Sequence, residues 1–176
     1  MSAPPGPIIR PCTESDVSAV ASILNESIAA RDSTLMLEPV SDATVLGWMA
    51  HFNDRERLFV LEEAGVVVGW GIIRRYSDRE GYRLTCETSI FLRRSERGRG
   101  LGSFLQRALM DRCRELGYHH LVAKIFADNQ TSIRLHQRFG YRMVGVQKEI
   151  GIVDGRWQDV AILQYVFDEN DSPTNQ

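Results

Sequence analysis

Residues 97–103 read Arg97-Gly98-Arg99-Gly100-Leu101-Gly102-Ser103, and the fold can be predicted outward from this run. The preceding residues 86–92 are rich in β-forming side chains and predict a strand. The residues that follow place apolar side chains, among them Leu105 and Leu109, at helical spacing. The segment is therefore predicted to be a strand, a glycine-rich turn and the start of a helix.

A turn of this kind is predicted to bind an anion. The first N–H groups of a helix have no intrahelical partner, and the positive end of the helix dipole adds to their effect. Glycine matters because a Cβ would keep a phosphate away from the amides. Arg97 and Arg99 add positive charge at the rim. The alternative is a plain glycine-rich connection with two solvated arginines, since glycine motifs alone give false matches.

The spacing of the glycines argues against two common nucleotide sites. The dinucleotide motif needs Gly-x-Gly-x-x-Gly and an acidic residue about 20 positions later. Here the glycines alternate, and Asp111 and Glu115 lie inside the predicted helix. A P-loop is excluded because no Gly-Lys-Ser/Thr follows. The turn therefore favours a phosphate-bearing cofactor other than NAD or a nucleoside triphosphate.

The composition is typical of one soluble globular domain. We expect a flexible leader at residues 1–7, a single domain at 8–168 and a flexible tail at 169–176. Of the 176 residues, 43% are hydrophobic and 25% are charged, and the net charge of −2 gives no general attraction to nucleic acid or membranes. Nucleic-acid binding by the local arginine cluster is the weakest alternative, and it predicts steep salt dependence.

The three cysteines are widely spaced and show neither metal-binding nor disulfide spacing. Reduced thiols in a cytoplasmic protein are the simplest interpretation. The first residues contain no apolar signal region, and no apolar run approaches the roughly 18 residues of a membrane span. No metal site and no membrane partner are therefore expected.

Periodicity and turn signals predict an α/β (α+β) fold with about seven strands, in the order β-α-α-β-β-β-α-β-α-β-β. We expect a mixed, mostly antiparallel sheet with helices on both faces, in which the strand from Tyr82 and the strand from Leu121 are parallel neighbours joined by a crossover helix. Trp157 is expected in the core. The predicted helices span about 13–30, 41–49, 101–116 and 129–139, and the predicted strands span 8–10, 58–62, 66–73, 82–92, 121–125, 141–150 and 157–167.

A second run, residues 129–141, reads Asn-Gln-Thr-Ser-Ile-Arg-Leu-His-Gln-Arg-Phe-Gly-Tyr. With the first run it resembles the GCN5-related N-acetyltransferase (GNAT) superfamily. The R/Q-x-x-G-x-G/A turn of that superfamily, which holds the pyrophosphate of acetyl-CoA, is matched by Arg97, Gly100 and Gly102. Its N-x-x-S-x-x-L-[YH]-x-x-x-G-[FY] helix is matched by Asn129, Ser132, Leu135, His136, Gly140 and Tyr141. The predicted order of elements agrees with the GNAT fold.

Within the superfamily, residues 8–168 are similar to the phosphinothricin and methionine sulfoximine N-acetyltransferases, notably in Tyr82-Arg83-x-Thr85-x-Glu87 and Gly155-x-Trp157-x-Asp159. The resemblance implies direct transfer of acetyl from acetyl-CoA to a small-molecule amine, such as an amino acid or an analogue, by a homodimer. The residues implied for acetyl-CoA are Ile90, Phe91, Leu92, Arg97, Gly98, Arg99, Gly100, Leu101, Gly102, Ser103, Asn129 and Ser132.

Glu87 is the candidate general base. An alkyl amine with a pKa near ~10 must lose a proton before it attacks a thioester. Strand alternation puts Glu87 and Phe91 on one face and Cys86 on the other. The alternative for Glu87 is a paired carboxylate at the rim of the sheet. Cys86 is a rival nucleophile, but a small buried hydrophobe is favoured for it.

The acceptor site departs from the family pattern. Ser77 stands where relatives often have an arginine for the acceptor carboxylate, and Arg75, Arg79 and Arg83 are the candidates to replace it. Aromatic residues of relatives are likewise replaced by Ser27 and Leu35. For His136, an ordinary helix-surface histidine is the alternative to a substrate contact. The residues predicted to bind the acceptor are Glu80, Gly81, Tyr82, Arg83, Glu87 and His136.

Two rival functions remain open on the sequence. One is an N-acetyltransferase acting on a protein N-terminus, a lysine or a polyamine. The other is a non-catalytic module that binds acyl-CoA, against which the presence of Glu87 argues mildly.

Overall fold

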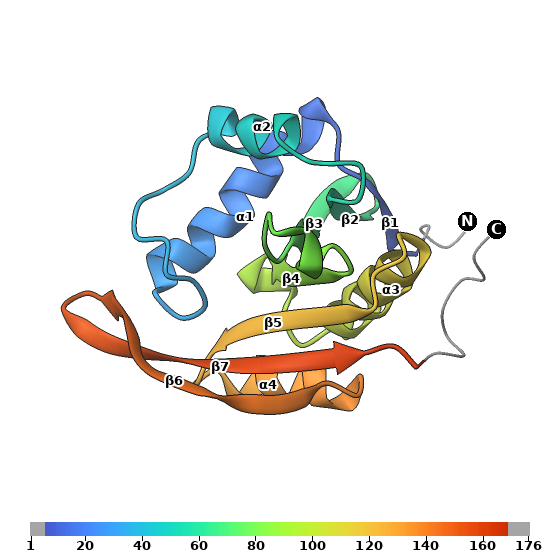
Figure 1. Ribbon diagram of the computed structural model, residues 1–176. Coiled ribbons are helices and arrows are strands. Elements are labelled where there is room, and N and C mark those ends of the chain that lie inside the picture. Colours follow the sequence, from blue (N-terminus) through green and yellow to red (C-terminus); the bar gives the residue numbers. More distant parts are fainter. Residues whose placement is uncertain (1–5, 169–176) are drawn as a thin grey trace.

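The computed structural model describes residues 6–168, so the predicted tail and residues 1–5 of the predicted leader lie outside the described part. Its helices and strands follow the predicted order (Figure 1). The helices are α1 (Val17–Ala30), α2 (Asp42–Ala50), α3 (Leu101–Glu115) and α4 (Gln130–Arg138). The strands are β1 (Ile8–Pro11), β2 (Arg57–Glu63), β3 (Val66–Arg75), β4 (Thr85–Leu92), β5 (His120–Phe126), β6 (Arg142–Val153) and β7 (Arg156–Val166).

The strands form a seven-stranded sheet in the order β1-β2-β3-β4-β5-β7-β6. β4 and β5 run parallel, and the other neighbouring pairs are antiparallel. The chain passes from β4 to β5 through α3, as the predicted crossover requires. The predicted mixed, mostly antiparallel sheet is therefore confirmed.

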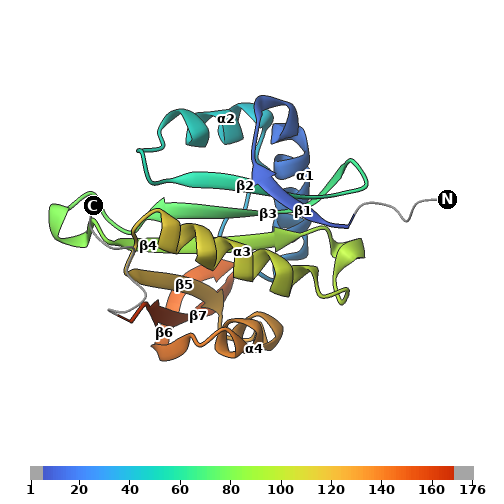
Figure 2. The same cartoon turned by 90° about the vertical axis from the view of Figure 1, so that its right-hand side faces the viewer.

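Helices cover both faces of this sheet (Figures 1 and 2). On one face, α1 and α2 bury Val20 and Val45 against Trp70 of β3. On the other face, α3 and α4 bury Leu109 and Ile133 in one cluster with Cys86 of β4. Because side chains alternate along a strand, Glu87 points toward the α1–α2 face. The structure thus assigns Glu87 and Cys86 to different layers of the protein.

Local signals set the helix boundaries. Before α1, the Asp16 carboxylate accepts hydrogen bonds from the N–H and the hydroxyl of Thr13, both at 2.8 Å, as part of a capping box. Arg10 pairs with the same carboxylate at 2.7 Å and holds the pKa of Asp16 well below its usual range. Gly117, directly after the C-cap of α3, has φ +75°. This left-handed conformation is typical of a glycine that ends a helix.

Two sequence predictions are wrong. The strand expected from Tyr82 begins only at Thr85, because Glu80–Tyr82 form a 3-10 turn. In that turn the N–H of Tyr82 donates to the carbonyl of Arg79 at 2.9 Å. Trp157, expected in the core, is 62% exposed, because it lies near the tip of the β6–β7 hairpin. In Figure 1 this tip projects from the left of the molecule.

Among residues 6–168, no helix has the combined length and apolar character needed to cross a membrane.

Candidate active site

The centre of the sheet opens where β4 and β5 diverge. Their parallel pairing covers Thr85 to Glu87 on β4 and ends at the pair Glu87–Val122. From there β5 continues to pair with β7, and β4 continues to pair with β3 as far as Leu92. The β5-facing edge of residues 88–92 is therefore left without a strand partner among the described residues. An extended ligand with amide groups can add to such an edge.

The glycine-rich turn lies directly beyond this open edge. Gly98 and Gly100 have φ +79° and +80°, which favours glycine, and Gly100 is the N-cap of α3. Within residues 6–168, the N–H groups of residues 98–102 donate to no acceptor. The N–H of Ser103 differs from them, because it donates to the carbonyl of Gly100 at 3.1 Å. The free donors at the start of α3 fit an anionic group such as a pyrophosphate.

The arginines around the turn are paired with carboxylates. Arg99 donates to both carboxylate oxygens of Glu63, at 2.8 and 3.0 Å, and also contacts Glu96. These hydrogen bonds raise the pKa of Arg99. Arg97 lies 3.6 Å from Asp32. The main-chain donors of the turn are therefore better placed to bind an anion than these two predicted side chains.

The second sequence motif meets the first at the start of α3. A Cβ built on Gly102 would lie 3.5 Å from Leu135 of α4 and 3.7 Å from Leu92 of β4. Asn129 is the N-cap of α4, and its side-chain oxygen accepts from the N–H of Ser132 at 3.1 Å. The Asn129 side-chain NH₂ has no acceptor within residues 6–168. It is thus a free donor just beyond the carboxyl end of β5.

Glu87 lies where the two strands separate. Its carboxylate is 2.7 Å from Nζ of Lys124 on β5, and its side chain is 30% exposed. In the antiparallel register of β3 and β4, it lies directly opposite Arg74. The pairing with Lys124 agrees with the structural alternative for Glu87 as well as with a catalytic one.

The predicted acceptor residues fall into two groups. Glu80, Gly81, Tyr82 and Arg83 lie in the exposed turn before β4, where Tyr82 packs against Tyr76 with ring centroids 5.4 Å apart. His136 is only 4% exposed. Its Nδ1 is 2.8 Å from the carbonyl of Ser132, and its ring meets Tyr141 edge-on.

His136 belongs to the α3–α4 side of the sheet, since Tyr141 is part of the core cluster of that side. Burial lowers the pKa of His136. Glu87 points to the opposite face of the sheet, so the two predicted acceptor residues His136 and Glu87 are not brought together. Cys86 is fully buried, with its sulfur 3.8 Å from that of Cys113. It is thus a core residue, as the favoured interpretation predicted.

Three residues of this region were not predicted from the sequence as parts of the site: Lys124, Arg74 and Trp48. Lys124 is a single charge within the apolar strand His120–Phe126, and this pattern was a signal that could have been used. Arg74 follows an apolar run in the same way. Their proximity to Glu87 depends on strand register, which local sequence patterns do not define.

Comparison with known proteins now identifies the family. Residues 20–141 match the model of the acetyltransferase (GNAT) family. The chain belongs to this family. The GNAT chain is 31% identical to the L-methionine sulfoximine/L-methionine sulfone acetyltransferase of Salmonella typhimurium, over 94% of this chain and 97% of that protein. It is also 31% identical to the phosphinothricin N-acetyltransferase of Streptomyces viridochromogenes, over 91% and 87%.

A solved structure agrees with this assignment. The acetyltransferase structure from Salmonella typhimurium, determined with acetyl-CoA, matches this GNAT chain with a TM-score of 0.88 and 30% identity, over 94% of this chain and 96% of that one. The predicted enzyme class, an N-acetyltransferase with acetyl-CoA as cosubstrate, is confirmed.

Proposed function

We propose that this GNAT enzyme transfers acetyl directly from acetyl-CoA to the primary amine of an amino acid or a close analogue, with Glu87 as general base. The observation that carries the proposal is the position of Glu87 at the start of the opening between β4 and β5, with the phosphate-binding turn at the far end of the same strand. The acetyltransferases of methionine sulfoximine and phosphinothricin among its relatives support the class of acceptor.

Different residues along this opening bind different parts of acetyl-CoA. The N–H groups of residues 98–102 hold the pyrophosphate, and the open edge of Ile90, Phe91 and Leu92 pairs with the amide-containing arm of acetyl-CoA. The Asn129 side chain donates to the same arm. The thioester is thereby placed beside Glu87, so that an amine bound there is within reach of the carbonyl carbon.

Glu87 makes the amine reactive. Its carboxylate accepts a proton from the acceptor ammonium, directly or through one water. The nitrogen lone pair then forms the C–N bond, and the C–S bond breaks so that the thiolate leaves with the electron pair of that bond. The nitrogen loses its second proton to solvent, which gives the neutral amide. The thiolate is finally protonated from solvent, and the proton held by Glu87 returns to solvent. Binding both reactants in this geometry supplies the proximity that the reaction lacks in water.

A thiol-release assay with a panel of amines tests this function. We expect release with L-methionine sulfone and L-phosphinothricin, and much weaker release with spermidine or with a short peptide that has a free N-terminus. Release with the peptide or with spermidine alone would favour the rival acceptors. Acetyl-CoA binding by calorimetry without release for any amine would identify a non-catalytic module instead.

We also propose that the enzyme is a homodimer. The β6–β7 hairpin exposes large apolar side chains, including Val144, Ile152 and Trp157, which are 59%, 49% and 62% exposed. β6 is also the last strand of the sheet. Exposed apolar surface beside an open strand edge is typical of an interaction surface.

Substitution within this surface tests the dimer. We expect Ile152→Glu to convert the dimer into a monomer in sedimentation velocity, because it places a charge within the apolar patch. Gln158→Glu, on the same hairpin but outside the patch, is the matched control. A monomeric wild-type enzyme at micromolar concentration would contradict the proposal.

A cytoplasmic location is likewise proposed. It is supported by the three free cysteines, of which Cys86 and Cys113 lie close together without being bonded. Fractionation with an antibody against the chain would test it.

A further inference from the structure

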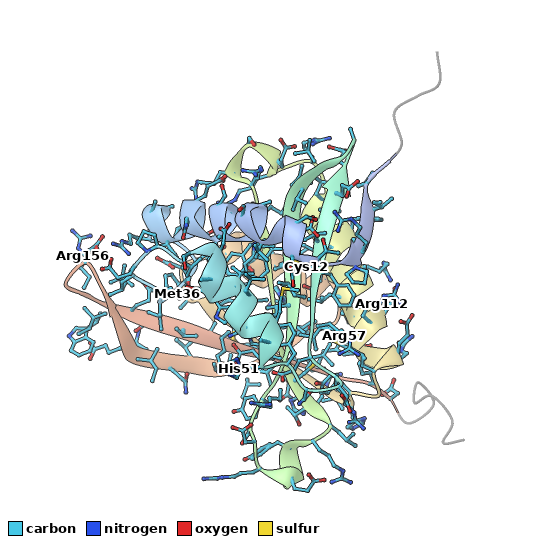
Figure 3. The ribbon with its side chains drawn as sticks, turned by 90° about the horizontal axis from the view of Figure 1, so that it is seen from above. Cys12, Met36, His51, Arg57, Arg112 and Arg156 are labelled. Atoms are coloured by element: carbon cyan, nitrogen blue, oxygen red, sulfur yellow. The ribbon has the colours of Figure 1, made fainter. Side chains whose placement is uncertain are left out.

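A cavity of ≈ 340 Å³ lies between the end of α2 and the end of β3. Its lining includes Trp48, His51 and Phe52 from the α2 side, and Arg74 from β3. Figure 3 labels His51 at the end of α2. Of the residues that the sequence suggested for the acceptor, only Arg75 lines this cavity.

Arg74 has an unusual environment within this cavity. Its guanidinium carbon lies 4.9 Å from the centroid of a Trp48 ring, which braces the side chain by cation–π stacking. Arg74 donates no hydrogen bond to a carboxylate among residues 6–168. Burial lowers its pKa, although Glu56 and Glu87 are close enough to raise it in part. A partly desolvated guanidinium whose N–H groups donate to no carboxylate has unused capacity for a bidentate anion.

The nearby carboxylate of Glu56 is already engaged. It accepts hydrogen bonds from the N–H of Asn53 at 3.0 Å and from the N–H of Arg75 at 3.1 Å, and the Arg75 side chain lies 3.4 Å away. Glu56 is therefore held by its own loop and by the end of β3. Glu56 lines the same cavity, but its oxygens are used by Asn53 and Arg75, so the N–H groups of Arg74 remain available to another acceptor.

Arg74 also lies next to the proposed base. The register of β3 and β4 pairs Arg74 with Glu87. Directly opposite residues of this kind have Cβ atoms about 5 Å apart on the same face of the sheet. Lys124 approaches Glu87 from the other side, at 2.7 Å. Glu87 is thus an anion between two cations, and a ligand that carries only positive charges would be repelled by both.

We propose that Arg74, braced by Trp48, is the ligand for the acceptor carboxylate, and that the cavity beside α2 receives this anionic end of the acceptor. This inference rests on the proposed function and narrows it to amines with a free carboxylate a few bonds from the nitrogen. The ammonium lies at Glu87 while the carboxylate lies at Arg74. A polyamine has no such group, and a peptide has none beside its N-terminal amine.

The other candidate arginines are less suited to this role. Arg75 is paired with Glu56 and, at 2.6 Å, with Asp78. Arg83 lies 3.6 Å from Glu80 in the exposed turn. Arg79 is exposed in the same loop. Arg74 instead lies opposite Glu87 in the sheet, stacks on Trp48 and lines the cavity.

The test compares an acid with its amide. Two substrates are assayed, L-methionine sulfone and L-methionine sulfone carboxamide. The proteins are wild type, Arg74→Gln, Arg74→Lys and a matched control, Arg112→Gln on α3. For Arg74→Gln we expect kcat/KM for the acid to fall about 30- to 100-fold, mostly through KM, as for a lost charge-assisted hydrogen bond. The value for the amide should change less than about threefold, because the amide makes no such bond. Arg74→Lys should recover part of the loss, and the KM for acetyl-CoA should stay constant throughout.

The possible outcomes distinguish the role of Arg74 from the proposed amino-acid acetylation. A collapse of the acid-to-amide preference in Arg74→Gln alone supports the assignment. An equal loss for acid and amide, or an unchanged preference, overturns it while amino-acid acetylation stands. Wild-type turnover of spermidine or of the peptide, but of neither sulfone compound, overturns both the assignment and the amino-acid function.

Discussion

Glu87→Gln is expected to lower kcat/KM for the amine acceptor about 100- to 10,000-fold near neutral pH, the usual range for loss of a general base. The substitution keeps the shape of the side chain but removes its ability to accept a proton. Acetyl-CoA affinity by calorimetry should remain at the wild-type value, because the glycine-rich turn proposed to bind the pyrophosphate is at the other end of β4. Glu115→Gln, which removes a carboxylate from a surface ion pair on α3, is the matched control and should retain full activity.

The pH dependence of this defect distinguishes a base from a structural ion pair. An alkyl amine has a pKa near ~10, so the neutral amine becomes abundant as the pH rises and a base is needed less. The difference between wild type and Glu87→Gln should therefore shrink between pH 7 and pH 10. If Glu87 only pairs with Lys124, Glu87→Gln and Lys124→Met should show equal losses at every pH. Such a partly exposed pair contributes at most about 1 kcal/mol to stability.

Gly100→Ala is expected to weaken the binding of coenzyme A about 10- to 100-fold in equilibrium dialysis. Gly100 has φ +80°, and a Cβ built on it meets no protein atom within 4 Å. The protein itself thus has room for the methyl group, which would project into the space in front of the free amides. A phosphate held away from even one of these N–H groups loses a charge-assisted hydrogen bond worth about 1.5–3 kcal/mol.

Gly117→Ala provides a control for backbone strain. Gly117 lies beyond the other end of α3, also has a positive φ, +75°, and also has open space around a built Cβ. Both substitutions should lower the free energy of unfolding by about 1–2 kcal/mol, the usual cost of a left-handed conformation for a residue with a side chain. Only Gly100→Ala should weaken the binding of coenzyme A. Equal affinities for the two variants would mean that the turn does not hold the pyrophosphate.

The sequence by itself determined the features that depend on neighbouring residues. The left-handed glycines, the unpaired amides at the start of α3 and the Asn129 cap of α4 are all formed within a few residues of chain. Such features follow from backbone sterics and short-range hydrogen bonds, which local sequence expresses directly. The parallel placement of β4 and β5 could also be predicted, because the handedness and length of a crossover leave few alternatives.

Only the tertiary structure decided the surroundings of Glu87. Arg74 and Lys124 reach it through the registers of β3 and β5, and Trp48 reaches Arg74 through the packing of α2. The same holds for Arg99, whose charge is directed to Glu63, 36 positions earlier in the chain. Long-range contacts of this kind depend on how whole elements pack and align, and a local run of side chains carries little information about that alignment. Glu87 and the glycine-rich turn could therefore be predicted from the sequence, whereas the positions of Arg74 and Lys124 beside Glu87 were decided by the fold.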